Sequence, residues 1–271
     1  MRLPNILREL PPVIAERVFY RYYNQRQHLY PEWFRRARLR LNPALEMQDL
    51  VIGDVISGQI ALGGFYEYDL SRRIQKHSKH GGLFVDVGAN IGYFTLIWLA
   101  GNPSNRAIAV EASAANQNRI ETNISANGFT NRCSLIKKAA GHREQKVAFD
   151  PGPEEQTGWG GICVDSRSDT SDHIDMIRLD SIIQEKVAVM KIDVEGADTW
   201  VIKGCENLFR SRLVDIVYFE QNIQRMSSLG IKNGEAQEFL TSFDEASFAD
   251  PGKGTASREE FADRLYLVLK D

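Results

Sequence analysis

One segment restricts the fold of this chain more than any other: a short apolar run that leads into a glycine loop and then into a helix. The apolar run is Leu83–Val87, the loop holds Gly88 and Gly92, and helical sequence begins at Tyr93. A buried strand, a glycine turn and a helix form the first unit of a doubly wound α/β sheet, in which ligands bind at the carboxyl ends of the strands. The segment therefore predicts both the fold class and the position of a ligand site.

The remainder of the chain continues this alternation. Helical segments separate most of the further strand-like runs, which are residues 107–110, 134–138, 187–192, 214–219 and 265–269. Helices between strands imply right-handed crossovers and parallel neighbours. The sequence therefore predicts an α/β fold with a doubly wound, mainly parallel sheet, in a domain over residues 51–271.

Residues 1–50 differ from that domain and predict a helical, basic N-terminal appendage. Helices are expected over residues 13–23 and 32–41, each of which begins after proline. Residues 1–42 contain nine Arg and three Glu, a net charge of +6, in a chain whose formal net charge is −3. Such a basic, aromatic segment is compatible with a peripheral membrane contact. Packing of its aromatic residues on the sheet or on a second subunit is the interpretation that we favour.

The overall composition narrows the classes of function. A net charge of −3 argues against nucleic acid as a partner. The three cysteines are odd in number and lack metal-ligand spacing, which suits free thiols in a reducing compartment. The sequence shows no signal-peptide pattern and no apolar run near the roughly 18 residues of a membrane span. These features predict a cytoplasmic protein.

The alternation of strands and helices fails between residues 149 and 174. Prolines and glycines interrupt any regular element there, and Trp159 stands among them. A long irregular stretch inside a compact domain is usually functional or disordered. Because a tryptophan is embedded among these glycines, we interpret this stretch as a lid over the ligand site.

The glycine loop also indicates which nucleotide binds. Dinucleotide folds use G-x-G-x-x-G so that a pyrophosphate can sit on the helix N-terminus. Here the spacing from Gly88 to Gly92 is G-x-x-x-G, and the strand before it carries Asp86. A carboxylate repels a pyrophosphate and attracts the ammonium and sulfonium of S-adenosylmethionine. We therefore predict that Asp86, Gly88 and Gly92 bind this cofactor, and that Gly92 also permits close helix packing.

Two further groups of charged residues follow later strands. Glu111 ends the second strand and can accept hydrogen bonds from both ribose hydroxyls, although an acid there also suits a helix N-terminus. Lys191, Asp193 and Glu195 share one face at the end of another buried strand. Asp193 and Glu195 are candidates for the catalytic base, and the alternative is that they form ion pairs with Lys191.

Together these motifs resemble the FkbM-type methyltransferases; the matching stretches are residues 85–92, 110–111, 179–180 and 191–196. The resemblance implies a Rossmann-like class I methyltransferase fold, S-adenosylmethionine as methyl donor, S-adenosylhomocysteine as product, and a hydroxyl on a sugar or polyketide as acceptor. It also implies cofactor contacts from Glu67, which follows Phe65 and Tyr66 in a tyrosine–glutamate element, and from Asn90 and Ala112. Unlike most of the family, this chain has no proline soon after Glu111.

The function that we predict is methyl transfer to a small-molecule or glycan acceptor, without a metal. Three alternatives stay open. A nicotinamide-dependent oxidoreductase is disfavoured by the missing G-x-G-x-x-G pattern. Methylation of nitrogen or carbon is compatible with the same motifs, and so is a non-catalytic scaffold at a membrane surface that keeps the fold. The sequence also leaves open whether the protein is an oligomer.

Overall fold

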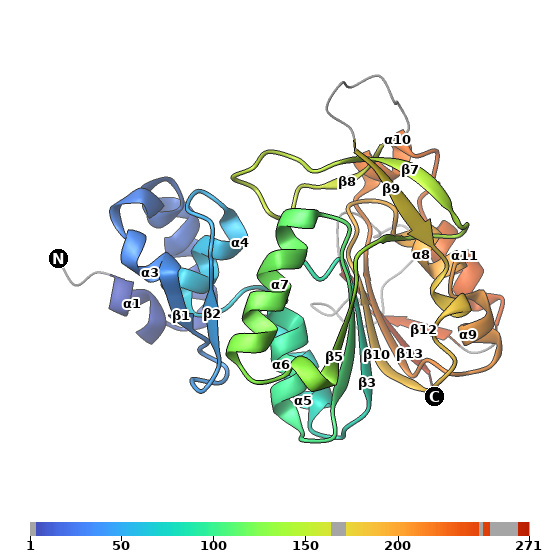
Figure 1. Cartoon of the computed structure of the whole chain (residues 1–271), viewed down its shortest axis with the longest axis horizontal. Coiled ribbons are helices and arrows are strands. Elements are labelled where there is room, and N and C mark those ends of the chain that lie inside the picture. Colours follow the sequence, from blue (N-terminus) through green and yellow to red (C-terminus); the bar gives the residue numbers. More distant parts are fainter. Residues whose placement is uncertain (1–3, 164–171, 244–245, 250–264, 271) are drawn as a thin grey trace.

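A computed structural model describes residues 4–163, 172–243, 246–249 and 265–270 of the chain. Helices and a small hairpin at the N-terminal end lie on one side of a larger layered domain, in which helices flank a central sheet (Figure 1). No helix in the described part of the chain is long and apolar enough to cross a membrane.

The central sheet has seven strands in the order β12-β13-β11-β10-β3-β4-β5. Their bounds are Ala246–Ala249 (β12), Leu265–Lys270 (β13), Ile216–Glu220 (β11), Val187–Ile192 (β10), Leu83–Val87 (β3), Arg106–Val110 (β4) and Cys133–Ile136 (β5). The five strands from β11 to β5 are parallel, whereas β13 pairs antiparallel with both β11 and β12. This confirms the predicted doubly wound, mainly parallel fold, although the edge strand β12 was not predicted.

Helices cover both faces of this sheet (Figure 1). One layer consists of α5 (Tyr68–Ser78), α6 (Tyr93–Gly101) and α7 (Ala114–Ala126), and the other of α8 (Asp198–Lys203), α9 (Glu206–Arg210) and α11 (Glu235–Thr241). Strand β3 shows how its sequence serves the two layers, because its side chains alternate between them. Phe84 packs into the core under α5–α7, and Val85 and Val87 pack into the core under α8, α9 and α11. Both faces are apolar, as parallel strands require.

A second sheet lies over the carboxyl ends of the central strands, in the order β6-β9-β7-β8. Its strands are Ala139–Ala140 (β6), Asp172–Ile177 (β9), Gln145–Asp150 (β7) and Gly161–Cys163 (β8). The prediction of an irregular stretch from 149 to 174 was therefore wrong in part, since β8 and the start of β9 pair with β7. Residues 164–171 lie outside the described part of the chain. We call residues 151–160, which join β7 to β8, the lid loop.

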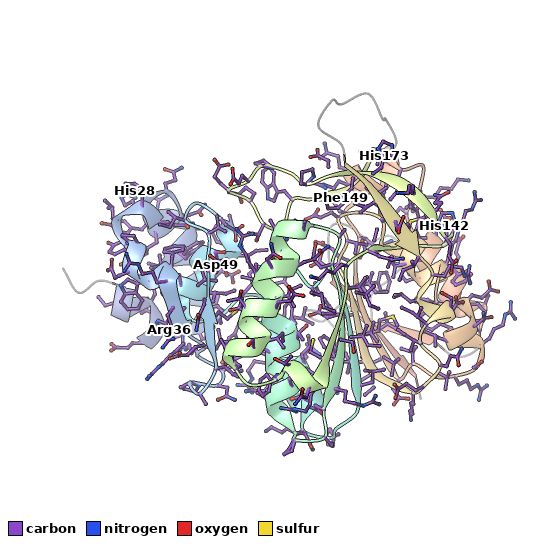
Figure 2. The ribbon with its side chains drawn as sticks, in the orientation of Figure 1. His28, Arg36, Asp49, His142, Phe149 and His173 are labelled. Atoms are coloured by element: carbon purple, nitrogen blue, oxygen red, sulfur yellow. The ribbon has the colours of Figure 1, made fainter. Side chains whose placement is uncertain are left out.

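The N-terminal region, residues 4–63, is helical with one short hairpin. Its elements are α1 (Pro4–Glu9), α2 (Pro12–Val18), η1 (Phe19–Tyr23), η2 (Asn24–Leu29), α3 (Pro31–Arg35), β1 (Arg36–Arg38), β2 (Glu46–Gln48), α4 (Val55–Gly58) and η3 (Gln59–Gly63). The helix predicted over 13–23 is present. The helix predicted over 32–41 ends at Arg35, because the next residues alternate and pair with β2. Ala37 and Leu39 are buried, whereas Arg36 and Arg38 are exposed, and Arg36 lies on the surface of this region (Figure 2).

Contacts within the N-terminal region extend beyond the predicted boundary at residue 50. The guanidinium of Arg8 donates a hydrogen bond to the carbonyl oxygen of Ala61 at 2.8 Å, and the amide of Gln27 donates one to that of Asp54 at 3.1 Å. Helices α4 and η3 thus pack with the segments that precede them. The division of the chain at residue 50 stays a prediction, and these contacts favour a boundary near Gly64.

Candidate active site

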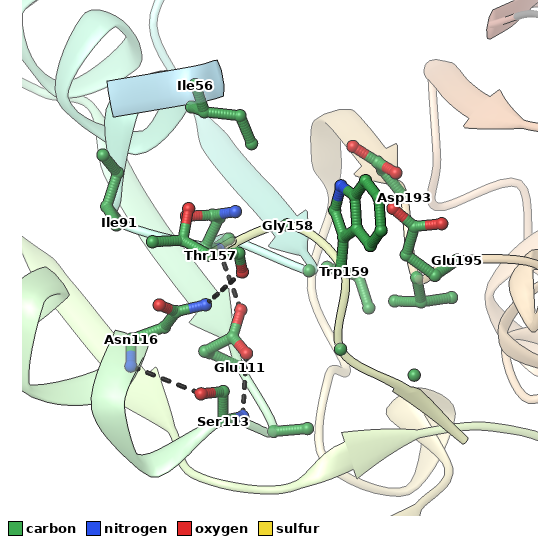
Figure 3. Close-up of a pocket in the computed structure, with 18 of the residues that line it drawn as sticks. Ile56, Ile91, Glu111, Ser113, Asn116, Thr157, Gly158, Trp159, Asp193 and Glu195 are labelled. Atoms are coloured by element: carbon green, nitrogen blue, oxygen red, sulfur yellow. Dashed lines mark hydrogen bonds between the residues drawn. The ribbon is translucent and has the colours of Figure 1, made fainter. Parts of the chain in front are cut away.

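A cavity of about 330 Å³ lies where β3, β4, β10 and β11 end (Figure 3). The strand ends contribute Gly88, Glu111, Asp193 and Glu220 to its wall. Two other parts of the chain complete the wall: the N-terminal region, with Tyr20, Asp54, Val55 and Ile56, and the lid loop with β8, through residues 156–162. The cavity therefore occupies the place that the glycine loop predicted.

The glycine loop is shaped by its contact with the end of β10. Gly88 has φ +73°, and a Cβ atom there would lie 1.9 Å from the backbone oxygen of Asp193. Gly92 has φ +85°, but a Cβ atom would meet Ile120 at an ordinary 3.6 Å. Gly92 is thus required by its backbone conformation, and the predicted need for close helix packing is wrong. Asn90 also adopts a left-handed conformation, with φ +53°, which is uncommon for a residue other than glycine.

Glu111 is held in a fixed orientation facing the cavity. One carboxylate oxygen accepts a hydrogen bond from the backbone N–H of Asn90 and the other accepts one from that of Ser113, both at 2.8 Å (Figure 3). Burial raises the pKa of Glu111 to about 7, against the effect of these two hydrogen bonds. Ala112 lines the cavity beside it.

Asp86 lies beneath the glycine loop. It is fully buried, and its carboxylate accepts a hydrogen bond from the hydroxyl of Thr95 at 2.6 Å. Burial raises its pKa. Neither Asp86 nor Gly92 is among the described residues that line the cavity. The direct cofactor contacts expected of Asp86 and Gly92 stay predictions, while the position of Asp86, 4.0 Å from the ammonium of Lys191, favours a supporting role for its carboxylate.

Lys191 is a buried cation at the centre of the site, 2% exposed. Its ammonium donates a hydrogen bond to the carbonyl oxygen of Gly88 at 3.1 Å and forms an ion pair with Asp193 at 2.9 Å. Burial alone would lower the pKa of Lys191, but the carboxylates of Asp193 and Asp86 raise it above its ordinary value. Lys191 thereby links the glycine loop to the loop after β10.

Asp193 and Glu220 share a hydrogen bond. Burial, followed by the charge of Asp193, raises the pKa of Glu220 to about 10, so Glu220 is protonated at neutral pH and donates to Asp193. The pKa of Asp193 is lowered because Lys191 outweighs burial. An acid at the end of a strand, such as Glu220, is more often solvated. The structure instead brings it into the cavity wall.

Glu195 forms its ion pair with Arg225, whereas the sequence suggested Lys191 as its partner. Strand β10 ends at Ile192, so the alternation that groups Glu195 with Lys191 does not extend this far. Its carboxylate forms an ion pair with Arg225 at 3.4 Å and accepts a hydrogen bond from the amide of Asn222 at 3.3 Å. Burial raises the pKa of Glu195. An ion pair of Glu195 with Lys191 was one alternative, and it was wrong.

Glu67 contributes to the same wall from the turn before α5. It has φ +39°, a conformation that costs free energy in a residue other than glycine and often marks a functional site. Burial, and then the charge of Asp193, raises the pKa of Glu67 to about 7. Tyr66 lines the cavity next to it. Acidic residues that lie far apart in the sequence thus meet in one cavity.

The lid loop contributes residues that carry no recognisable motif. Trp159 is 56% exposed and lies beside Asp193 and Glu195 (Figure 3). Thr157 and Gly158 line the cavity near Asn90. The interpretation of this loop as a lid is consistent with these positions. Tyr20 and Ile56 were missed because neither belongs to a motif, and their contact with the cavity depends on long-range packing.

Metal ligation has no evident site in the parts of the chain that the structure covers, where no three His, Cys, Asp or Glu side chains gather in a suitable group. The carboxylates of the cavity are engaged by Lys191, Arg225, each other and backbone N–H groups.

Comparisons with known proteins bear on the identity of this site. One solved structure with a similar fold is the methyltransferase FkbM from Methylobacillus flagellatus KT, with 14% identity and a TM-score of 0.48 over 78% of this chain and 52% of that one. Another is the O-methyltransferase from Bacillus cereus in complex with SAH, with 12% identity and a TM-score of 0.41 over 76% of this chain and 83% of that one.

This chain thus spans about half the length of the Methylobacillus protein. A search of curated protein sequences found no match. The sequence profile described as "Methyltransferase FkbM domain" matches residues 86–248, which is more than half of the chain. The chain therefore belongs to the FkbM methyltransferase family.

Proposed function

We propose that this protein transfers a methyl group from S-adenosylmethionine to a hydroxyl of a sugar, polyketide or related small-molecule or glycan acceptor, and releases S-adenosylhomocysteine. The observation that carries the proposal is the convergence of the glycine loop, Glu111 and the carboxylates around Lys191 on one cavity at the strand ends. Family membership supports methyl transfer as the reaction.

The residues of the cavity fit this cofactor. The oriented carboxylate of Glu111 can accept hydrogen bonds from both ribose hydroxyls. The side-chain oxygen of Asn90 is buried and has no hydrogen-bond partner within the described residues, so it can accept one from a ligand. Glu67 and the backbone at Gly88 and Ala112 complete the proposed binding set. The bound cofactor supplies an electrophilic methyl group, and the protein must orient the acceptor and remove its proton.

Asp193 and Glu195 remain the candidates for the residue that takes this proton, and the two differ in environment. Asp193 is tied to Lys191 and Glu220, and its lowered pKa makes it a weak base. The pKa of Glu195 is raised, which brings it closer to the value that suits a general base at neutral pH. We therefore favour Glu195 as the base and Asp193 as the residue that holds Lys191.

The charges of the cavity wall support a neutral or cationic acceptor. Its two lysines within the described residues, Lys138 and Lys191, are already paired with Asp175 at 3.6 Å and Asp193 at 2.9 Å. A phosphorylated acceptor would face several carboxylates without a free cation to bind it. Hydroxyls of sugars and polyketides fit such a wall, and Trp159 and Tyr66 offer aromatic surface for them.

Calorimetry tests the cofactor first. We expect S-adenosylhomocysteine to bind and NAD not to bind. Glu111→Ala should weaken binding roughly ten- to a hundred-fold, the effect of losing charge-assisted hydrogen bonds worth about 1.5–3 kcal/mol. Glu121→Ala, which removes an exposed acid of α7 paired with Lys137, should leave binding unchanged. Binding of NAD and no response to either sulfur nucleoside would refute the proposal.

A turnover screen tests the acceptor. Release of S-adenosylhomocysteine is measured over hydroxyl-bearing sugars, polyketides and lipid-linked acceptors, and mass spectrometry locates the added methyl on oxygen, nitrogen or carbon. Product methylated on nitrogen or carbon would keep the methyltransferase and overturn the assignment to hydroxyls.

We also infer a reducing, cytoplasmic location. Cys133 and Cys205 are free thiols in the structure, and Cys205 is buried in the core between β10 and the helices over it.

A further inference from the structure

A buried carboxylate of the N-terminal region, that of Asp54, fastens the lid loop. Asp54 is 1% exposed and caps α4, where its Oδ2 accepts a hydrogen bond from the backbone N–H of Ser57 at 2.7 Å. The same carboxylate accepts two bonds from Thr157, from the backbone N–H at 3.1 Å and from the hydroxyl at 3.0 Å. A buried charge is costly unless it is hydrogen-bonded, so these bonds form a stable unit.

Other contacts hold the lid loop along its length. The amide of Gln156 donates to the carbonyl oxygen of Gly53 at 2.9 Å, and that of Asn116 in α7 donates to the carbonyl oxygen of Thr157 at 2.8 Å. At the far end, Arg225 donates to the carbonyl oxygen of Trp159 at 3.0 Å. The loop thus crosses from the N-terminal region to the helix α10 (Ile223–Ser228) and covers one side of the cavity.

The fastening at Asp54 differs from the others in strength. It is made by a carboxylate in a buried place, whereas Gln156 bonds to Gly53 at an exposed site and Arg225 is partly exposed. The bond from Asn116 is also buried, but a neutral amide donates it to a neutral carbonyl. Hydrogen bonds to a charged group in a buried setting are the stronger kind. If Thr157 moved away from Asp54, each oxygen of that carboxylate would also lose one hydrogen bond. This contact therefore contributes most to keeping the loop closed.

We propose that the Asp54–Thr157 pair is the latch of this lid, and that Asp54 is a positioning residue that sets how fast the cofactor and its product exchange. The proposal rests on the proposed function, since it takes S-adenosylmethionine and S-adenosylhomocysteine as the exchanging molecules. It gives the N-terminal region a role in turnover: the region provides the fixed point to which the lid closes.

Two variants separate the latch from the structural role of Asp54 as a helix cap. Thr157→Val removes the hydroxyl that bonds to Asp54 and leaves the cap of α4 intact. Asp54→Ser keeps a good N-cap residue but removes the carboxylate that reaches Thr157. Thr157→Ser, which retains the hydroxyl, is the rescue variant. Thr241→Val is the matched control, because the hydroxyl of Thr241 bonds only within α11.

The dissociation rate of S-adenosylhomocysteine is measured by stopped flow with the intrinsic tryptophan fluorescence as the signal, to which Trp159 of the lid loop contributes. We expect Thr157→Val and Asp54→Ser to release it about ten-fold faster, the size expected when a hydrogen bond to a charged group is lost. Thr157→Ser and Thr241→Val should release it at the parent rate. Unchanged rates in both latch variants would overturn the proposal.

Hydrogen exchange of the ligand-free protein tests the lid without the cofactor. Backbone amides of residues 151–160 should exchange faster in Thr157→Val and Asp54→Ser, while those of β3 and β10 stay protected. Equal exchange in parent and variants would refute the latch. If exchange becomes faster but the parent binds no S-adenosylhomocysteine, the proposed function fails, the role in cofactor exchange fails with it, and the fastening itself stands.

Discussion

Replacement of Asp193 by Asn is the perturbation that best separates architecture from chemistry at this site. The change removes the charge that lies 2.9 Å from the ammonium of Lys191, and it keeps the shape of the side chain. Lys191 is 2% exposed, so water cannot replace the lost partner. Asp86 remains as a second carboxylate, at 4.0 Å. The expected effect is therefore a loss of stability.

The size of that loss follows from the burial of Lys191, whose side chain is 3% exposed, whereas that of Asp193 is 25% exposed. Removing one partner of a buried ion pair typically costs about 3–5 kcal/mol, and the remaining Asp86 places this case near about 3 kcal/mol. For a domain of this size, a change of about 1 kcal/mol moves the melting temperature by roughly 2–4 °C. We therefore expect Asp193→Asn to melt about 6–12 °C below the parent.

Glu195→Gln provides the comparison, because its ion pair with Arg225 lies between partly exposed side chains. Such pairs contribute about 0–1 kcal/mol, so this variant should melt within a few degrees of the parent. If Glu195 is the base, its turnover should fall roughly 10²–10⁴-fold while binding of S-adenosylhomocysteine is retained. The two variants are compared by thermal melting and by single-turnover rate. A melting point of Asp193→Asn equal to that of Glu195→Gln would refute this account of Lys191.

Three further predictions follow from other parts of the site. The pKa of Glu111 is about 7, and ribose hydroxyls donate best to its ionised carboxylate, so the affinity for S-adenosylhomocysteine measured by calorimetry should rise as pH rises through about 7. This pH dependence should vanish in Glu111→Gln, and a pH-independent affinity of the parent would contradict the prediction. Gly88→Ala should prevent folding or lower the melting point far more than Gly128→Ala, since both have similar positive φ but a Cβ atom meets nothing within 4 Å at Gly128; equal melting points would show that the contact with Asp193 is not limiting. Asp86→Asn should lower the melting point and leave the affinity for S-adenosylhomocysteine nearly unchanged. An unchanged melting point with a large loss of affinity would restore Asp86 as a direct cofactor contact.

The sequence predicts the parallel strands of the central sheet well because each buried strand is recognisable from its own residues. Leu83–Val87 and Val187–Ile192 are apolar on both faces, and no tertiary contact is needed to recognise them. The failure at Arg36–Arg38 has the opposite cause. Arg, Ala and Leu favour helices, and only pairing with Glu46–Gln48 makes this segment a strand.

The position of a site residue was predictable from the sequence where the residue lies in a strand or directly after one. Asp86 could have been placed better, since it has the same parity as Phe84 and must face the layer of α5 and α6. The partner of Glu195 could not, because Arg225 lies thirty residues further on, in a helix with no motif. The residues that close the cavity from the N-terminal region depend on how two distant parts of the chain pack.

The contact between Gly88 and the backbone oxygen of Asp193 has a consequence for how this family can diversify. The glycine loop touches the main chain at position 193, not its side chain. At Gly88 itself the steric limit therefore comes from the backbone after β10, while the side chain of Asp193 acts on the loop only indirectly, through Lys191. Conversely, an insertion of one residue after Ile192 would displace the oxygen and force the two loops to move together. A change in the length of the loop after β10 would therefore disrupt both halves of the site.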